Sequence, residues 1–315
     1  MTDLSATSQK QITIVVPAYN EEGNVAVLRD RVAATLDPLG RYSWKMLFVD
    51  DGSRDGTLGA LKRLAQEDPR VGYLSFSRNF GHQAALKAGL DEARGAAVIS
   101  MDADLQHPPE LLPQLLSLWE QGAEIVYTLR QDTVEVGVFK RATSRLFYRA
   151  FNALSDLDLD PGAADFRLLD RKVVEAVRQI PESGLFLRGM IHWMGFRQAA
   201  LPYRVGTRHS GSSKYTFSKM LRLASDGVLS FSTKPLRMAS LAGCAVSGLS
   251  GLYALYAVAM HLFNRNTISG WTSLLISVLF LGGIQLLSIG LLGEYLGRVL
   301  MESKRRPHYL ISERG

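Results

Sequence analysis

Two long segments without any charged residue constrain this chain most. Met238–Met260 and Asn266–Gly293 contain no Asp, Glu, Lys or Arg. Each is longer than the roughly 20 residues that an α-helix needs to cross the hydrocarbon core of a bilayer. A buried core hairpin is the alternative, although soluble helices of this length usually carry charge on one face. The sequence therefore predicts a transmembrane hairpin over residues 238–297, with spans at about 238–260 and 270–294.

Basic residues flank this predicted hairpin on one side. Lys234 and Arg237 precede the first span, further basic residues follow the second, and the loop contains only Arg265. Because basic flanks stay on the cytoplasmic side, we predict a multi-pass protein of the cytoplasmic membrane with its N-terminal domain in the cytoplasm. Residues 298–315 are expected to form a cytoplasmic basic tail. Residues 1–10 are polar and unlike a signal peptide, so we expect a disordered lead.

The N-terminal part alternates between short apolar runs and segments with helical spacing of apolar residues. Strands are predicted at Ile12–Val16, Trp44–Val49, Val71–Phe76, Ala97–Met101 and Glu124–Tyr127, with helices over about 22–36, 56–66, 82–94 and 108–121. This α/β alternation indicates a mostly parallel sheet with helices on both faces. Ligands of such sheets bind beyond the carboxyl ends of the strands. We predict a cytoplasmic catalytic domain over residues 11–215.

Two further segments combine apolar residues at helical spacing with basic residues. Residues 136–154 carry a basic stripe, and residues 216–231 carry an apolar one. An ordinary surface helix would show the same pattern. The functional alternative is a helix lying on anionic lipid headgroups, and the net charge of +6 suits an anionic partner. We expect amphipathic interface helices, the second forming a juxtamembrane helix over 216–237.

Carboxylates follow the fourth predicted strand. The segment Val-Ile-Ser-Met-Asp-Ala-Asp-Leu-Gln places Asp102 and Asp104 two residues apart, and Gln106 follows. If the strand continued, the alternation of its side chains would project both carboxylates to the same side. Converging oxygen atoms suit a hard cation such as Mg²⁺ or Mn²⁺, which could hold the diphosphate of a sugar nucleotide. The alternative is a solvated acidic turn. The single cysteine, Cys244, excludes a cysteine metal cluster.

Polar residues also follow the first two predicted strands. Pro17-Ala18-Tyr19-Asn20-Glu21-Glu22 comes after the first, and Asp50-Asp51-Gly52-Ser53 after the second. A carboxylate at a strand end can accept hydrogen bonds from a nucleobase or a ribose hydroxyl, and a tyrosine ring can stack on a base. Either segment alone is ordinary turn chemistry. Together with the Asp-x-Asp segment they form a much more specific set.

Four segments together resemble family 2 glycosyltransferases, namely PAYNEE, VDDGSRDGT, SRNFGHQAALKAGL and MDADLQHP. They are most similar to the polyprenyl-phosphate hexosyltransferases, a group that includes dolichol-phosphate mannose synthase-like enzymes. The C-terminal GEYLGRVLMESKRRPHYLI looks like the bacterial branch with a membrane hairpin. The resemblance spans about residues 11–311. It implies a nucleotide-diphospho-sugar transferase fold and inverting transfer of one hexose to a polyprenyl phosphate such as undecaprenyl phosphate, with UDP-glucose as the first expected donor.

The resemblance also implies roles for the residues that match the family's motifs. Nucleotide binding is expected from Pro17, Tyr19, Glu21, Asp50, Asp51 and Asp102, and metal binding from Asp102, Asp104 and Gln106. Catalytic roles are expected for Asp104 and for Asp165 and Arg167, which match a motif near the sugar and acceptor. Candidates to hold the acceptor phosphate are Arg141, Arg208, Ser213, Lys214 and Tyr215. His82 is a departure, because relatives often carry lysine there, and a phosphate contact from an imidazole would depend on pH.

A mechanism follows from these parts. Mg²⁺ or Mn²⁺ would neutralise the leaving nucleoside diphosphate. The acceptor phosphate is largely dianionic near neutral pH and needs less help from a base, so Asp165 acts either as that base or in positioning the sugar. A processive polysaccharide synthase is an alternative, but the sequence lacks its Gln-x-x-Arg-Trp motif. A non-catalytic, membrane-anchored scaffold that binds sugar nucleotides is another. We expect a homo-oligomer and no nucleic-acid partner.

Overall fold

The computed structural model describes residues 9–131, 162–182, 186–204, 232–264 and 270–315. These residues form two units. The first holds the described residues up to 204 together with 307–315, and the second holds 232–306. The predicted basic helix at 136–154 and the segment 216–231 lie outside the described residues. The same is true of the acceptor-phosphate candidates Arg141, Arg208, Ser213, Lys214 and Tyr215.

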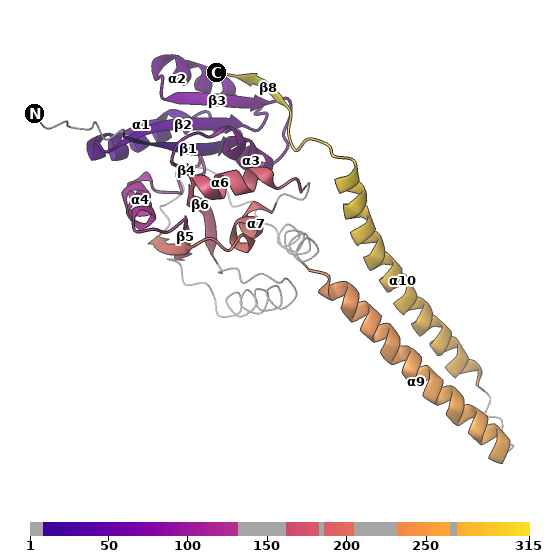
Figure 1. Ribbon diagram of the computed structural model, residues 1–315. Helices are drawn as coiled ribbons and strands as arrows, with labels where there is room; N and C mark the ends of the chain where they lie inside the picture. The colour runs from indigo at the N-terminus through magenta and orange to yellow at the C-terminus, as the bar shows by residue number, and fades with distance from the viewer. Residues whose placement is uncertain (1–8, 132–161, 183–185, 205–231, 265–269) are drawn as a thin grey trace, which may run out of the picture. The chain divides into compact units, whose positions relative to one another are not determined.

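An eight-stranded sheet forms the centre of the first unit, in the order β7-β5-β6-β4-β1-β2-β3-β8 (Figure 1). Its strands are β1 (Lys10–Ala18), β2 (Tyr42–Asp50), β3 (Val71–Phe76), β4 (Ala97–Ser100), β5 (Ile125–Gln131), β6 (Ala163–Asp170), β7 (Gln198–Arg204) and β8 (Ile311–Arg314). Strands β1 to β4 pair in parallel, as do β5 and β7. Strand β6 runs antiparallel to β4 and β5, and β8 runs antiparallel to β3. The predicted α/β class is confirmed, and the two antiparallel strands are additions to it.

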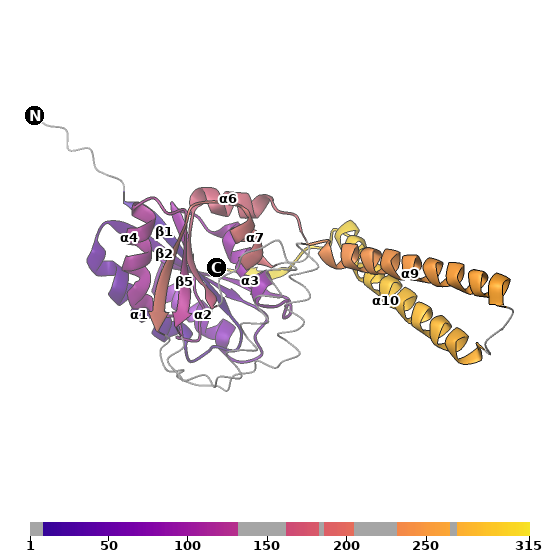
Figure 2. The same ribbon diagram turned by 90° about the horizontal axis from the view of Figure 1, so that it is seen from below.

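Helices cover both faces of this sheet (Figure 2). One face carries α1 (Val25–Leu36), α2 (Thr57–Glu67) and α4 (Leu112–Glu120), with the short 3-10 turns η1 (Asp37–Leu39) and η2 (Pro109–Leu111). The other carries α3 (His82–Glu92), α6 (Arg171–Gln179) and α7 (Leu187–Trp193). Apolar residues at helical spacing explain the burial, because side chains such as Leu28 are fully enclosed against the sheet. Each such side chain contributes about 1.5–3 kcal/mol.

The register of the parallel strands brings their carboxyl ends to one edge. Ala18 pairs with Asp50, and Asp50 pairs with Ser75. Val15 pairs with Ser100, the last residue of β4. The segments that follow β1, β2, β3 and β4 therefore begin side by side, which is the arrangement that the sequence predicts for a ligand site.

The last residues of the chain return to the first unit as strand β8, seen beside β3 in Figure 1. The ring of Tyr309 stacks on Phe76 with centroids 5.1 Å apart, and its hydroxyl donates to Asp91 at 3.0 Å. The Ser312 hydroxyl donates to the Ser75 carbonyl at 3.0 Å. The expectation of a basic tail at 298–315 missed this strand, which covers the otherwise unpaired edge of β3.

Tyr309→Ala is expected to destabilise the protein by about 3 kcal/mol, because the stacked ring and its hydrogen bond are both lost. The thermal midpoint, followed by tryptophan fluorescence of the full-length protein, should fall by about 6–12 °C. The matched variant Tyr309→Phe keeps the ring, so we expect a loss of only about 1 kcal/mol. Wild-type midpoints for both variants would show that this contact does not form.

The second unit contains the long helices α9 (Lys234–Asn264) and α10 (Trp271–Ser303), which contact each other. Large apolar side chains on α10 face outward, and Leu287 is 75% exposed. Within the described residues, one segment, Phe280–Ser303 of α10, is long and apolar enough to cross a membrane. It overlaps the predicted span 270–294 but begins and ends later. The predicted span 238–260 lies in α9, some of whose side chains fall outside the described part.

Candidate active site

A pocket of about 300 Å³ opens where β1, β2 and β4 end. It brings together many of the predicted residues and adds others from the segment between β3 and α3 and from the start of α3. The predicted residues in its lining are Pro17, Tyr19, Glu21, Asp51, Asp102 and Asp104, and the added ones include Asn79, Gly81 and His82. Asp50, Gln106, Asp165 and Arg167 do not line this pocket. A pocket therefore lies at the predicted strand ends, and some of the predicted residues do not line it.

The two carboxylates after β2 bind protein groups. Asp50 is 1% exposed and accepts hydrogen bonds from the Ser75 hydroxyl at 2.8 Å and the Ser53 N–H at 3.1 Å. Asp51 accepts the backbone N–H groups of Phe80 at 2.7 Å and Gly81 at 2.9 Å. Burial raises the pKa of Asp51 above its ordinary value, although these two N–H groups act in the opposite direction. Asp50 is therefore buried and bound to protein groups, and Asp51 fixes the loop that leads into α3.

The loop after β2 packs tightly against the loop after β3. Gly52 has φ +66°, and a Cβ atom there would lie 2.5 Å from the carbonyl carbon of Arg78. Only glycine fits this position, because both the backbone conformation and the close approach exclude a side chain. The loop after β1 is similarly fixed, since Glu21 N–H donates to the Thr57 hydroxyl at 2.8 Å. The Tyr19 side chain is 40% exposed, which leaves its ring accessible for stacking.

Asp102 and Asp104 lie in a turn after β4. This corrects the strand-alternation argument, because β4 ends at Ser100. The turn passes through Leu105, whose φ of +62° is an uncommon value for a side chain other than glycine. The Gln106 N–H donates to Asp104 Oδ1 at 3.1 Å, which closes the turn. Both residues line the larger pocket.

His107 supports the same turn, and the sequence interpretation gave it no role. Its side chain is 7% exposed and stacks on Phe166, with ring centroids 5.1 Å apart. The Asp102 N–H donates to His107 Nδ1 at 3.0 Å. His107 Nε2 lies 3.7 Å from Asp102 Oδ2. The only signal in the sequence was its position directly after the Asp-x-Asp-x-Gln segment.

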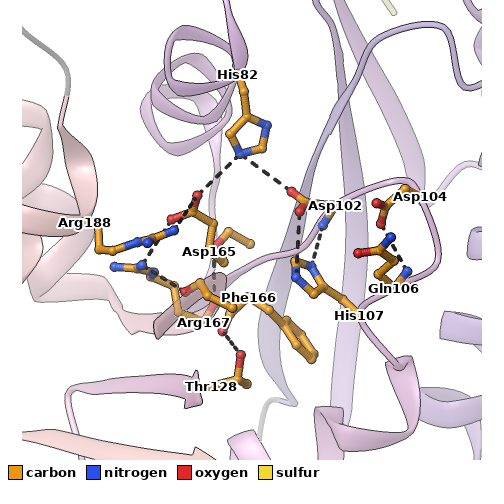
Figure 3. A network of polar contacts seen from close by, with 12 residues as sticks. His82, Asp102, Asp104, Gln106, His107, Thr128, Asp165, Phe166, Arg167 and Arg188 are labelled. Atoms are coloured by element: carbon orange, nitrogen blue, oxygen red, sulfur yellow. Dashed lines mark hydrogen bonds and ion pairs between the residues drawn. The ribbon is translucent and has the colours of Figure 1, made fainter. Parts of the chain in front are cut away.

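Asp165 lies at the centre of a cluster of charged side chains (Figure 3). Arg167 Nη2 is 3.2 Å from its Oδ1, and Arg188 Nη2 is 3.3 Å from its Oδ2. His82 Nε2 lies 3.7 Å from Asp165 Oδ2 and 3.6 Å from Asp102 Oδ1, so the imidazole bridges the two carboxylates. This proximity follows from the antiparallel pairing of β6 with β4, in which Arg167 lies opposite Ser100.

The charges of this cluster determine the protonation of its members. Burial would raise the pKa of Asp165, but the charges of Arg188, His82 and Arg167 hold that pKa well below its ordinary value. Burial lowers the pKa of His82, but Asp165 and Asp102 outweigh it and raise the pKa to about 9. Burial lowers the pKa of Arg167 to about 10, against the attraction of Asp165. At neutral pH Asp165 is therefore ionised, and His82 and Arg167 are protonated.

Arg167 is buried beside Asp165 and does not line the larger pocket. Its side chain is 4% exposed, and Nη2 also donates to the Ala164 carbonyl at 3.0 Å. It lines a second, smaller cavity together with Tyr127, Arg188 and His192. The guanidinium of Arg167 therefore contacts Asp165 and lines the smaller cavity.

The sequence model of the family described as "Glycosyl transferase family 2" matches residues 13–178. The "Uncharacterized glycosyltransferase YkcC" of Bacillus subtilis is 42% identical over 303 residues, covering 96% of this chain and 94% of that protein. The "Bactoprenol glucosyl transferase" of Shigella phage SfV is 42% identical over 301 residues, covering 96% and 98%. The chain belongs to glycosyltransferase family 2, and it is a glycosyltransferase with the predicted nucleotide-sugar transferase fold.

Proposed function

We propose that the protein transfers a single hexose from a nucleotide-diphospho-sugar to a polyprenyl phosphate, with inversion at the anomeric carbon. The observation that carries this proposal is the juxtaposition of two acidic groups of different kinds. The half-buried turn of Asp102 and Asp104 lines a pocket that can hold a sugar nucleotide, and the ionised Asp165 lies 3.7 Å from the same His82. The name of the Shigella phage relative supports a lipid phosphate as acceptor and glucose as the sugar.

The two carboxylates of the turn fit Mg²⁺ or Mn²⁺. Among the described residues, no group of three His, Cys, Asp or Glu side chains is placed to hold a metal ion. Mg²⁺ is commonly bound by one or two carboxylates together with water and substrate phosphates, so Asp102 and Asp104 suffice for an ion that binds with a diphosphate. When bound, the ion would neutralise the charge that develops on the leaving nucleoside diphosphate.

The protein's own residues bind the nucleoside, position His82 and stabilise charge at the sugar. The exposed Tyr19 ring stacks on the base, and Glu21 beside it accepts hydrogen bonds from the nucleoside. Asp51 fixes the loop that presents His82. The low pKa of Asp165 makes its carboxylate a poor proton acceptor. It therefore orients the sugar and stabilises positive charge at the anomeric centre, while the acceptor phosphate attacks without needing a strong base.

The membrane arrangement belongs to the same proposal. We place α9 and α10 across the cytoplasmic membrane, with the catalytic domain in the cytoplasm. The apolar segment Phe280–Ser303 supports one crossing, and the basic residues Lys234 and Arg237 in the first turn of α9 support the orientation. Outward-facing side chains such as Leu286 and Leu287 would be covered by lipid or by further copies of the chain.

A donor screen tests this function. Purified full-length protein in nanodiscs would receive undecaprenyl phosphate, Mn²⁺ or Mg²⁺, and in turn UDP-glucose, UDP-galactose, UDP-N-acetylglucosamine and GDP-mannose. We expect one donor, UDP-glucose first, to release nucleoside diphosphate and to add one hexose to the lipid by mass spectrometry. Lipid-independent release, a polymeric product or no turnover with any donor would contradict the proposal.

His107 offers a sharper test of the acidic turn. His107→Leu removes the acceptor for the Asp102 N–H and is expected to lower kcat by about 10- to 100-fold, because supporting residues commonly have effects of this size. His107→Asn retains a polar atom near the Nδ1 position and should lose less. The rate at saturating donor is measured for both, with circular dichroism as the folding control. A leucine variant with wild-type kcat would show that the turn of Asp102 and Asp104 keeps its conformation without His107.

A further inference from the structure

Arg188 is a charged residue of the Asp165 cluster that neither the sequence motifs nor the family resemblance assigns. It comes from α7, and its Nη2 lies 3.3 Å from Asp165 Oδ2. Figure 3 shows its guanidinium directed at Asp165 beside that of Arg167. The Arg188 side chain is 31% exposed, whereas that of Arg167 is 4% exposed. Arg188 is therefore the more exposed of the two arginines that contact Asp165.

The start of α7 is tied to the same carboxylate by a second route. The Leu187 N–H donates to Gln83 Oε1 at 3.3 Å, and Gln83 Nε2 donates to Asp165 Oδ2 at 3.5 Å. Gln83 follows His82 at the beginning of α3. Asp165 Oδ2 therefore receives Arg188, Gln83 and His82 from two helices. Such convergence on one oxygen restricts the rotation of the carboxylate.

Stability alone does not account for this arrangement. Within the described part of the chain, the Nε atoms of Arg188 and Arg167 are buried and lack a hydrogen-bond partner. Buried polar groups in folded proteins are normally paired, so each exception calls for an explanation. Buried ion pairs are also weak contributors to stability, since apolar residues of similar volume often replace them without loss. Two guanidinium groups around one carboxylate are more readily explained if the reaction requires that carboxylate to keep one orientation.

We propose that Arg188 is a positioning residue for sugar transfer, which acts through Asp165 by holding its carboxylate in one orientation beside His82. The inference rests on the proposed function and adds to it a residue that contacts neither the nucleotide nor the reacting atoms. Removal of Arg188 should therefore reduce kcat, the rate at which bound substrates react, and leave donor binding unchanged. The conservative lysine should restore part of the rate, because it keeps the charge but lacks the planar fork.

The experiment compares Arg188→Ala and Arg188→Lys in the full-length protein. We expect the alanine variant to lower kcat by about 100-fold, the loss typical of a misplaced catalytic group, with less than about a threefold change in donor KM. The kcat of the lysine variant should be about tenfold higher than that of the alanine variant. Arg171→Ala is the matched control, because Arg171 is 30% exposed, pairs with Glu175 and lines neither cavity. It should retain the wild-type rate.

A double-mutant cycle separates this role from a merely structural one. In an Asp165→Asn background, Arg188→Ala should lower kcat by less than about a further threefold, because the group that Arg188 positions is already altered. An equal loss in both backgrounds, or a rise in donor KM matching the fall in kcat, would overturn the inference. If Arg188→Ala fails to fold, the lysine variant decides by the same cycle. Absence of lipid-dependent turnover in the wild type would instead refute the proposed function.

Discussion

Asp104→Asn is expected to lower sugar transfer by about a thousandfold and to leave the fold intact. Asparagine keeps the side-chain oxygen that accepts the Gln106 N–H at 3.1 Å, so the turn should persist. The substitution removes the negative charge, and with it one of the two carboxylates proposed to hold a divalent cation against the donor diphosphate. The measurement is kcat at saturating donor and metal, with circular dichroism of both proteins.

Metal removal provides the companion measurement. Protein treated with a chelator should lose its activity, and Mn²⁺ or Mg²⁺ should restore it in the wild type but not in Asp104→Asn. Asp30→Asn is a suitable control, because Asp30 is also a surface carboxylate, 68% exposed, which pairs with Arg29 at 2.9 Å. It should behave as the wild type does. Near-full activity in chelator-treated protein would refute a metal role for this turn.

Strands β1 to β5 were predictable because their signals are local. Strands such as β1 are continuous apolar runs, and helices such as α1 carry their buried residues at regular spacing. The antiparallel strands β6 and β8 were not predicted. Their identity depends on pairing with β4 and β3, which lie far away in the sequence, and short edge strands carry weak patterns of their own.

The candidate site shows the same contrast between local sequence signals and contacts from distant segments. The motifs located the pocket residues that directly follow strands, including Tyr19, Asp102 and Asp104. They could not show that Asp50 is buried against Ser75, because that depends on which strand lies alongside β2. They also missed Arg188, whose importance comes only from the folding of α7 against Asp165. Ion pairs between distant segments leave no local pattern in a sequence.

Asp165→Asn is expected to lower kcat by about 100- to 1,000-fold. The variant removes the anion around which Arg167, Arg188 and His82 gather. Because two arginine charges then lack their partner, stability should also fall by about 3–5 kcal/mol. Thermal unfolding must therefore accompany the kinetic measurement, and assays belong at a temperature where the variant remains folded.

The pH dependence of this loss distinguishes positioning from base catalysis. A phosphate monoester has its second pKa near about 6, so the acceptor carries an extra proton below that pH and is dianionic well above it. A general base would matter most for the protonated acceptor. The deficit of Asp165→Asn would then shrink between pH 5.5 and pH 8.5, which lie about 0.5 units below and about 2.5 units above that pKa. Because the pKa of wild-type Asp165 is held well below its ordinary value, we expect a positioning role and a ratio of wild-type to variant kcat that does not fall as the pH rises. A ratio that falls tenfold or more over this range would assign the proton transfer to Asp165.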